Sequence, residues 1–121
     1  MGADGNPELF RSTASTSDGR TSLLRARIDD ADNAPVVTLT GELDLSTVPA
    51  LRGCLAPLEG RVIVDLRGVS FLDSSGIGAL VAARKALSSR GGDLTLRAPS
   101  SRVRRVLELT GLGQWVISSG P

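Results

Sequence analysis

Hydrophobic positions change their spacing several times after residue 21, and each change marks a boundary between predicted elements. Short runs of β-branched and aliphatic residues indicate strands, whereas longer segments with apolar residues three or four positions apart indicate helices. The predicted strands cover residues 22–28, 36–43, 61–66, 94–97 and 114–118. The predicted helices between them begin near residues 47, 75 and 100. This alternation predicts an α/β fold, in which helices pack on a mixed, mainly parallel sheet of about five strands.

The pattern of some segments also predicts how buried or how regular the element is. Residues 61–66 (RVIVDL) form a nearly continuous apolar run, which is typical of a strand covered on both faces. A loop is predicted over residues 67–74, before the helix that begins at Ser75. Gly41 lies inside a β-branched strand, which indicates a bulge or a close approach of another backbone. The first strand, residues 22–28, is expected at the edge of the sheet.

Residues 1–20 lack this spacing and are rich in Gly, Ser, Thr and Asp. We therefore predict a flexible tail there, followed by one folded domain over residues 21–121. No apolar run approaches the roughly 20 residues that span a bilayer. The first 20 residues also lack the apolar segment of a secretory signal. We therefore expect a cytoplasmic protein that is not a membrane protein.

The composition excludes several kinds of chemistry. The chain has no histidine and one cysteine, Cys54, so histidine-based catalysis, a histidine-ligated zinc site and an intrachain disulfide are impossible. Its 14 cations and 13 anions nearly cancel, and its aromatic residues are two phenylalanines and one tryptophan. A nucleic-acid binder would need a basic face or aromatic stacking platforms. We therefore expect no metal, no cofactor and no nucleic-acid partner.

The candidate chemistry lies in residues 71–80 (FLDSSGIGAL), which follow a buried strand and begin a helix. Sites in open α/β sheets form at this carboxyl edge, and the N-terminus of a helix favours negative charge. Asp73 or Ser74 can accept hydrogen bonds from the free N–H groups of the first turn. Gly76 and Gly78 have no side chains, which allows the backbone of another molecule to approach Ser75.

A phosphate on Ser75 would fit this position. It would add about −1.5 to −2 charges at pH 7, which a helix N-terminus tolerates. The same charge beside Asp73 would repel a docked partner, so the modification could abolish binding and leave the fold intact. The plainer alternative is that DSSG is an ordinary helix cap, whose small residues only allow the helix to pack tightly on the strand.

Four short motifs occur in this order along the chain: LTGELD at residues 39–44, VIVDL at 62–66, VSFLDSSGIG at 69–78 and LTGL at 109–112. Together they resemble the STAS family, and most closely its single-domain bacterial anti-sigma factor antagonists. The resemblance extends from about Val36 to Trp115. Its most specific part is the combination of DSSG with the upstream GELD.

The resemblance implies a STAS fold and a role in transcription regulation. Such proteins bind an anti-sigma factor that is also a serine kinase, and this binding releases a sigma factor. The kinase uses its own bound ATP to phosphorylate the second serine of DSSG, which is Ser75 here. The phosphoprotein then dissociates until a PP2C-type phosphatase restores it. By this resemblance the chain is not an enzyme, and it is expected to be a monomer.

The resemblance also assigns partner contacts around the acceptor. Glu42 and Asp44 match the acidic GELD loop, although solvated loop acids are the alternative. Asp73 either orients Ser75 or only caps the helix. The residues expected to contact the partner are Glu42, Asp44, Asp73, Ser74, Ser75, Gly76, Ile77, Gly78 and Arg84.

Arg84 is included because of the local charge. Residues 81–110 contain seven cations and two anions, a balance of +5. The plain interpretation is that these cations lie on solvated helix faces. The sharper hypothesis is that Arg84 or Lys85 meets acidic residues of the kinase, which would mainly raise the rate of association.

Two other functions compete with this one. The chain could be a STAS module of another kind, an accessory subunit that senses a ligand or binds a nucleotide. An esterase-like enzyme is excluded, because no G-x-S-x-G surrounds Ser75 and no histidine can serve as its base. The sequence also lacks the G-x-x-x-x-G-K-[ST] motif of nucleotide hydrolases.

Overall fold

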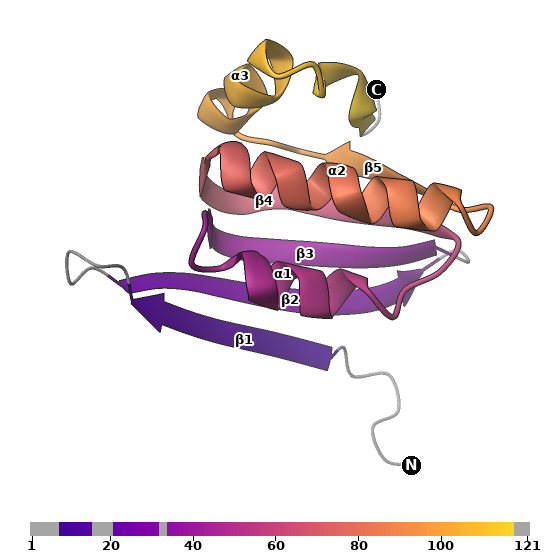
Figure 1. Cartoon of the computed structure of the whole chain (residues 1–121), viewed down its shortest axis with the longest axis horizontal. Helices are drawn as coiled ribbons and strands as arrows, with labels where there is room; N and C mark the ends of the chain where they lie inside the picture. Colours follow the sequence, from indigo (N-terminus) through magenta and orange to yellow (C-terminus); the bar gives the residue numbers. More distant parts are fainter. Residues whose placement is uncertain (1–7, 16–20, 32–33, 118–121) are drawn as a thin grey trace.

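The computed structural model describes residues 8–15, 21–31 and 34–117. Its strands are β1 (Glu8–Ser15), β2 (Thr21–Ala31), β3 (Ala34–Leu43), β4 (Arg61–Leu72), β5 (Asp93–Arg97) and β6 (Val116–Ile117). Its helices are α1 (Val48–Leu55), α2 (Ser74–Ser88), α3 (Ser101–Leu109) and the short 3-10 helix η1 (Gly113–Trp115). From β2 onward, the strands and α-helices follow the order that the sequence predicts (Figure 1). The strand predicted over residues 114–118 begins later, because η1 includes residues 114 and 115.

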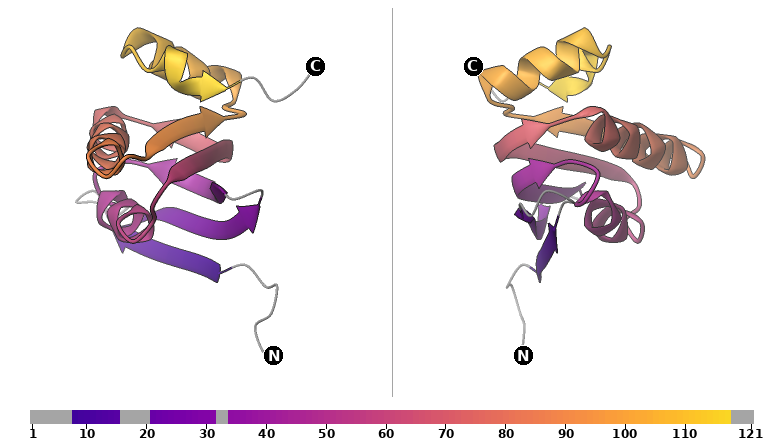
Figure 2. Two further views of the ribbon diagram at one scale, coloured as in Figure 1. Left: turned by 90° about the vertical axis from the view of Figure 1, so that its right-hand side faces the viewer. Right: turned by 60° about the vertical axis from the view of Figure 1, so that its left-hand side comes forward.

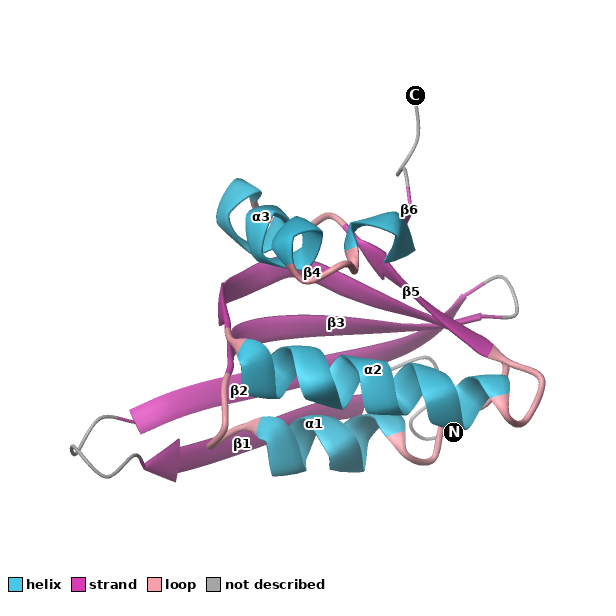
Figure 3. Cartoon of the chain, turned by 45° about the horizontal axis from the view of Figure 1, so that its top comes forward, coloured by secondary structure: helices cyan, strands magenta, loops and turns pink. Residues whose placement is uncertain are grey.

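The described strands form one sheet in the order β1-β2-β3-β4-β5-β6. The first two pairs are antiparallel, and the three pairs from β3 to β6 are parallel. The predicted α/β fold with a mixed, mainly parallel sheet is therefore confirmed. The helices α1 and α2 lie side by side on one face of the sheet (Figure 2). Because β3 and β4 are parallel, their carboxyl ends and the starts of α1 and α2 meet at one edge (Figure 3).

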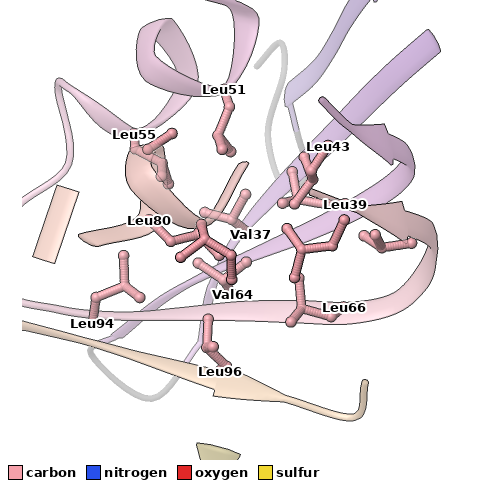
Figure 4. Packing of buried hydrophobic residues seen from close by; sticks show 14 of the residues in the cluster. Val37, Leu39, Leu43, Leu51, Leu55, Val64, Leu66, Leu80, Leu94 and Leu96 are labelled. Carbon is pink, nitrogen blue, oxygen red and sulfur yellow. The ribbon is translucent and has the colours of Figure 1, made fainter. Parts of the chain in front are cut away.

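The core lies between this face of the sheet and the helices. Where the central strands are regular, every second residue points into it, which is the period of two that a strand imposes. Helix α3 packs against β4 and adds Val103 and Leu107 to the same cluster. Each fully buried leucine or valine stabilises the fold by about 1.5–3 kcal/mol relative to an exposed one. The fully buried residues include Val37, Leu39, Leu51, Val64, Leu66, Leu80, Leu94 and Leu96 (Figure 4).

Helices α1 and α2 lie on one face of the sheet, and that residues 61–66 are covered on the other face as well stays a prediction. Val62 and Val64 are buried, whereas Ile63 is half-buried. Asp65 is also buried, and its carboxylate is satisfied there because Arg97 donates to its Oδ2 from Nε at 3.1 Å and from Nη2 at 2.9 Å. The apolar run agrees with the place of β4 inside the sheet, between β3 and β5.

The strand β1 corrects the prediction of a tail over residues 1–20. Its backbone pairs with β2, from Glu8 opposite Ile28 to Ser15 opposite Thr21. The expectation that the strand of residues 22–28 lies at the edge of the sheet is therefore wrong, because β2 lies between β1 and β3. The rest of that prediction, residues 1–7 and 16–20, lies outside the described residues. An edge strand is held through backbone hydrogen bonds on one side, which require no particular side-chain alternation, so ELFRSTAS gave no signal.

The strand β4 also extends through residues predicted as a loop. Its pairing with β3 slips by one residue twice, once between Asp65 and Gly68 and once between Val69 and Phe71. Such bulges interrupt the alternation of a strand and increase its twist. The irregular pattern of residues 67–72 is therefore that of a bulged strand.

Gly41 confirms the predicted close approach of another backbone. Its φ is +123°, in the region that favours glycine, and a Cβ at this position would overlap the carbonyl oxygen of Leu23 on β2.

The ion pair between Arg97 and Asp65 gives a first testable prediction. Arg97→Met leaves the buried carboxylate of Asp65 without its two-pronged partner, and we expect it to lower the free energy of unfolding by about 3 kcal/mol. Arg27→Met is the matched control, because it breaks a pair with Asp29 in which both side chains are exposed. Urea unfolding should show a loss below about 1 kcal/mol for this control. Equal losses in the two variants would contradict the role assigned to Arg97.

Candidate functional site

Asp73 builds the start of α2 at the carboxyl end of β4. Its backbone is extended, and its Oδ1 accepts hydrogen bonds from the N–H groups of Ser75 at 2.9 Å and Gly76 at 3.1 Å. Of the two caps that the sequence allows, the structure therefore uses Asp73. The aspartate satisfies two of the N–H groups that a helix start leaves free and places a negative charge at the positive end of the helix dipole.

The two serines of the motif lie at the surface of this turn. Ser74 is exposed and Ser75 is half-buried. Ser75 is the second residue of α2, and the backbone hydrogen bond to Asp73 fixes its position. The residue proposed as acceptor is thus both accessible and held in one place.

The two glycines of the first turns serve different purposes. At Gly76 a Cβ would lie 2.8 Å from the carbonyl oxygen of Leu43 and 2.8 Å from Cδ1 of Leu72. At Gly78 a Cβ would meet nothing within 4 Å. Gly76 is therefore required for the helix to pack on the sheet, as the plainer alternative holds, whereas Gly78 leaves open space beside the acceptor. Ile77, between them, is buried in the core.

The end of β3 is tied to the start of α2. The backbone N–H of Asp73 donates to the carbonyl oxygen of Leu43 at 3.1 Å. One residue later, Asp44 Oδ1 accepts from Ser46 N at 3.0 Å, from Ser46 Oγ at 2.7 Å and from Thr47 N at 3.2 Å. Asp44 thereby shapes the turn that leads into α1.

Glu42 also has a structural contact. Its Oε1 accepts the backbone N–H of Leu23 on β2 at 3.1 Å. Glu42, Asp44 and Asp73 are thus more than solvated loop acids, because each accepts a hydrogen bond from the backbone. Their contact with a partner stays a prediction.

Arg84 is the one predicted contact residue that the structure does not bring to this edge. It lies nine residues after Ser75 on α2, about 14 Å along the helix axis. Its Nε donates to Asp93 Oδ1 at 2.9 Å, and its Cζ lies 4.4 Å from the centre of the Trp115 ring. This guanidinium thus links α2, β5 and η1, which the sequence spacing could not reveal.

Two exposed apolar residues beside Glu42 were not singled out by the sequence pattern. Leu23 on β2 and Phe71 on β4 both remain about half exposed. In the sequence, Leu23 belongs to a strand expected at the edge of the sheet and Phe71 to a predicted loop. The exposure of these two residues depends on how β2 and β4 pair with β3, and the sequence alone does not reveal that register.

Neither a cluster of metal-ligating side chains nor a membrane-spanning helix occurs in the described ranges. These ranges hold no group of three or more side chains that could bind a metal ion together. They also contain no helix with the length and apolar character needed to cross a membrane.

The comparisons with known proteins agree with the motifs. A family model described as "Mlab, STAS domain" matches residues 26–118. The chain is 40% identical over 80 residues to the anti-sigma-B factor antagonist of Staphylococcus aureus (strain NCTC 8325 / PS 47), a match that covers 63% of this chain and 74% of that protein.

Two solved structures are similar to this one. The anti-sigma factor antagonist SpoIIAA in its unphosphorylated form superposes with a TM-score of 0.69 at 28% identity, over 78% of this chain and 88% of that chain. The Bacillus cell fate determinant SpoIIAA in the phosphorylated form superposes with a TM-score of 0.63 at 27% identity, over 78% and 91% of the two chains.

The two glycines after Ser75 predict opposite effects on stability. Gly76→Ala should lower the free energy of unfolding by about 1–3 kcal/mol, because its methyl group has no room against Leu43. Gly78→Ala should raise it by about 1 kcal/mol, because alanine favours a helix interior and the space there is open. Chemical unfolding of both variants checks this. Shifts of the same sign would contradict the packing described for the start of α2.

The Arg84–Asp93 pair predicts a dependence of stability on pH. The hydrogen bond from Arg84, and after it the one from the backbone N–H of Leu94, holds the pKa of Asp93 below its ordinary value of 3.8. A carboxyl whose pKa is lowered by folding stabilises the fold above the unfolded value, and the effect is lost as the pH falls through the folded value.

We therefore expect wild type to exceed Asp93→Asn in stability from about pH 7 to about pH 5, by less than about 1 kcal/mol because the pair is partly exposed. The difference should shrink below about pH 4, where the Asp93 carboxylate becomes protonated. Urea unfolding of wild type and Asp93→Asn at each pH measures this difference in stability. A difference that stays constant down to about pH 2 would mean that the charge of Asp93 is not its source.

Proposed function

Because the chain belongs to the STAS domain family, we propose that it is an anti-sigma factor antagonist controlled by phosphorylation of Ser75. Unphosphorylated, it binds an anti-sigma factor that is also a serine kinase, and this binding releases a sigma factor. The names of its relatives support the role, and so does its similarity to SpoIIAA in both unphosphorylated and phosphorylated forms. The observation that carries the proposal is the accessible serine that Asp73 fixes at the start of α2.

In the proposed reaction this chain supplies the acceptor and the kinase supplies the nucleotide. Oγ of Ser75 attacks the γ-phosphorus of ATP, a new O–P bond forms, and the bond from that phosphorus to ADP breaks. The hydroxyl proton passes to a base of the kinase. Hydrolysis by a PP2C-type phosphatase later transfers the phosphoryl group to water and regenerates the serine. The antagonist itself needs no catalytic group, in keeping with relatives that are regulators.

The position of Ser75 explains how such a modification would switch binding. The phosphate adds about −1.5 to −2 charges at pH 7. Within the chain, the helix dipole favours this charge by about 0.3–1 kcal/mol, so the fold persists. Toward a partner, the phosphate lies beside the Asp73 carboxylate and must be desolvated on docking. Each 1.4 kcal/mol of that cost weakens binding tenfold.

A capture experiment tests the proposal. Ser75→Ala, incubated with lysate of the organism that carries this chain, should retain a kinase both with and without ATP, because it cannot be phosphorylated. Wild type should retain the kinase only without ATP, and Ser75→Asp should retain little of it while unfolding at the wild-type temperature. Mass spectrometry of the wild-type protein should locate one phosphate on Ser75.

Ser74→Ala is the matched control, because its hydroxyl lies one residue away on the same turn. It should still be phosphorylated and released. A phosphate mapped to another residue would refute the assignment of Ser75. Tight binding of ATP or GTP to the isolated chain, measured by calorimetry and without capture of a kinase, would instead favour the ligand-sensing alternative.

A further inference from the structure

A groove runs between α1 and α2, which lie side by side on the sheet (Figure 2). Its volume is about 450 Å³, within the range of roughly 300–1,000 Å³ that is usual for small-molecule sites. Along α2 and the turn after it, the groove extends from Ala79 to Arg90, which is about 16 Å at 1.5 Å per residue. Neither Ser75 nor any acidic residue of the carboxyl edge lines it, so the proposed function does not account for this groove.

The side chains that line the groove are short and almost all apolar. In the described part of the chain they are five alanines, two leucines and two arginines, Arg52 and Arg90. Ala82 and Ala86 are exposed along α2, and their methyl groups fill little of the space between the helices. Sites for small molecules have this composition, in which apolar walls hold the body of a ligand and a few polar groups orient it.

The charges around the groove have one sign. Neither α1 nor α2 contains an aspartate or a glutamate, whereas Arg52 lies on α1, Lys85 lies on α2 and Arg90 follows α2. Nη2 of Arg90 donates to the carbonyl oxygen of Leu58 at 3.0 Å, which holds the guanidinium at this end of the groove. A guanidinium has five N–H donors in a rigid fork, so Arg90 can also bind a carboxylate with two parallel hydrogen bonds. The charge of the groove therefore fits an anion.

The dimensions of the groove favour a single hydrocarbon chain over a helix of another protein. Its volume divided by its length gives a mean cross-section of about 30 Å². A helix with its side chains is 10–12 Å across, a cross-section of roughly 80–110 Å², so only single side chains of a helix would enter. An extended chain of about a dozen carbons matches the length, because each C–C bond of about 1.5 Å advances the chain by slightly less than that.

We propose that the groove between α1 and α2 binds a long-chain fatty carboxylate, with the acyl chain along the alanines and the carboxylate on the guanidinium of Arg90. Burial of the chain supplies the affinity, because the hydrophobic effect grows with the apolar area removed from water. The paired hydrogen bonds to Arg90 select an anionic head group. The site is independent of the proposed function, because no residue of the groove takes part in the transfer of phosphate to Ser75.

The test titrates the full chain with dodecanoate in a calorimeter, below the concentration at which dodecanoate forms micelles. We expect saturable binding of one molecule per chain. Dodecyltrimethylammonium has the same hydrocarbon chain and the opposite charge, and it should bind at least about tenfold more weakly, because its head group meets like charges. Nuclear magnetic resonance should show that dodecanoate shifts the amide signals of residues 52–56 and 79–90 most.

Two leucine variants fill the groove. Ala82→Leu and Ala86→Leu should each weaken the binding of dodecanoate by about tenfold or more, because the larger side chain takes the place of the acyl chain. Both should unfold at the wild-type temperature, since leucine is a good helix former and both positions are exposed. Ser88→Leu is the matched control, because Ser88 is exposed on the same helix and does not line the groove. It should bind dodecanoate within about twofold of wild type.

Arg90→Gln examines the contact with the carboxylate. It should weaken the binding of dodecanoate by about tenfold at low ionic strength, because a hydrogen-bonded charge pair is lost. The difference from wild type should shrink as salt screens the charge. Arg105→Gln removes the same charge from an exposed position on α3, and it should bind within about twofold of wild type.

Several results would overturn the fatty-carboxylate site. They are the lack of saturable binding, equal affinity for the ammonium compound, and binding that both leucine variants leave unchanged. A dimer in sedimentation that Ala82→Leu converts to a monomer would assign the groove to a second copy of the chain, and it too would overturn the proposal. None of these results changes the capture of a kinase by Ser75→Ala, so the proposed function is decided separately.

Discussion

The site depends on one contact, the packing of the start of α2 against the end of β3. The N–H of Asp73 bonds to the carbonyl oxygen of Leu43, and Gly76 lies so close to that carbonyl that a side chain would not fit. The Asp73 carboxylate completes the turn by accepting from Ser75 and Gly76. Ser75 is thereby held in one orientation before any partner arrives, so docking does not require this turn to be ordered first.

The acidic residues of the edge combine two physical roles. Asp44 and Asp73 each accept backbone N–H groups at the start of a helix, and Glu42 accepts one from the neighbouring strand. These hydrogen bonds fix the direction of the carboxylates, while their charge still reaches the solvent and any molecule near it. The local structure and the electric field of the edge therefore come from the same side chains. A phosphate can alter that field without removing any of the hydrogen bonds.

The irregularities of β4 decide which of its side chains are exposed at this edge. A strand without bulges would send Val69 and Phe71 to the same side, whereas here Val69 is buried and Phe71 is about half exposed. The two register slips keep Val69 and Leu72 buried while Phe71 faces outward. A feature that looks like imperfect pairing thus gives the carboxyl edge an apolar surface beside its charges.

By itself, the sequence determined the order of the elements from β2 onward, the helix start at the DSSG motif and the absence of histidine-based catalysis. These follow from spacing and residue type, which are local properties. The strand β1, the extension of β4 through residues predicted as a loop, and the internal partners of Arg84 were decided only by the tertiary structure. So was the exposure of Leu23 and Phe71. Each of these depends on which distant segment lies alongside, and a backbone pairing or a bulge leaves no periodic pattern in the chain that makes it.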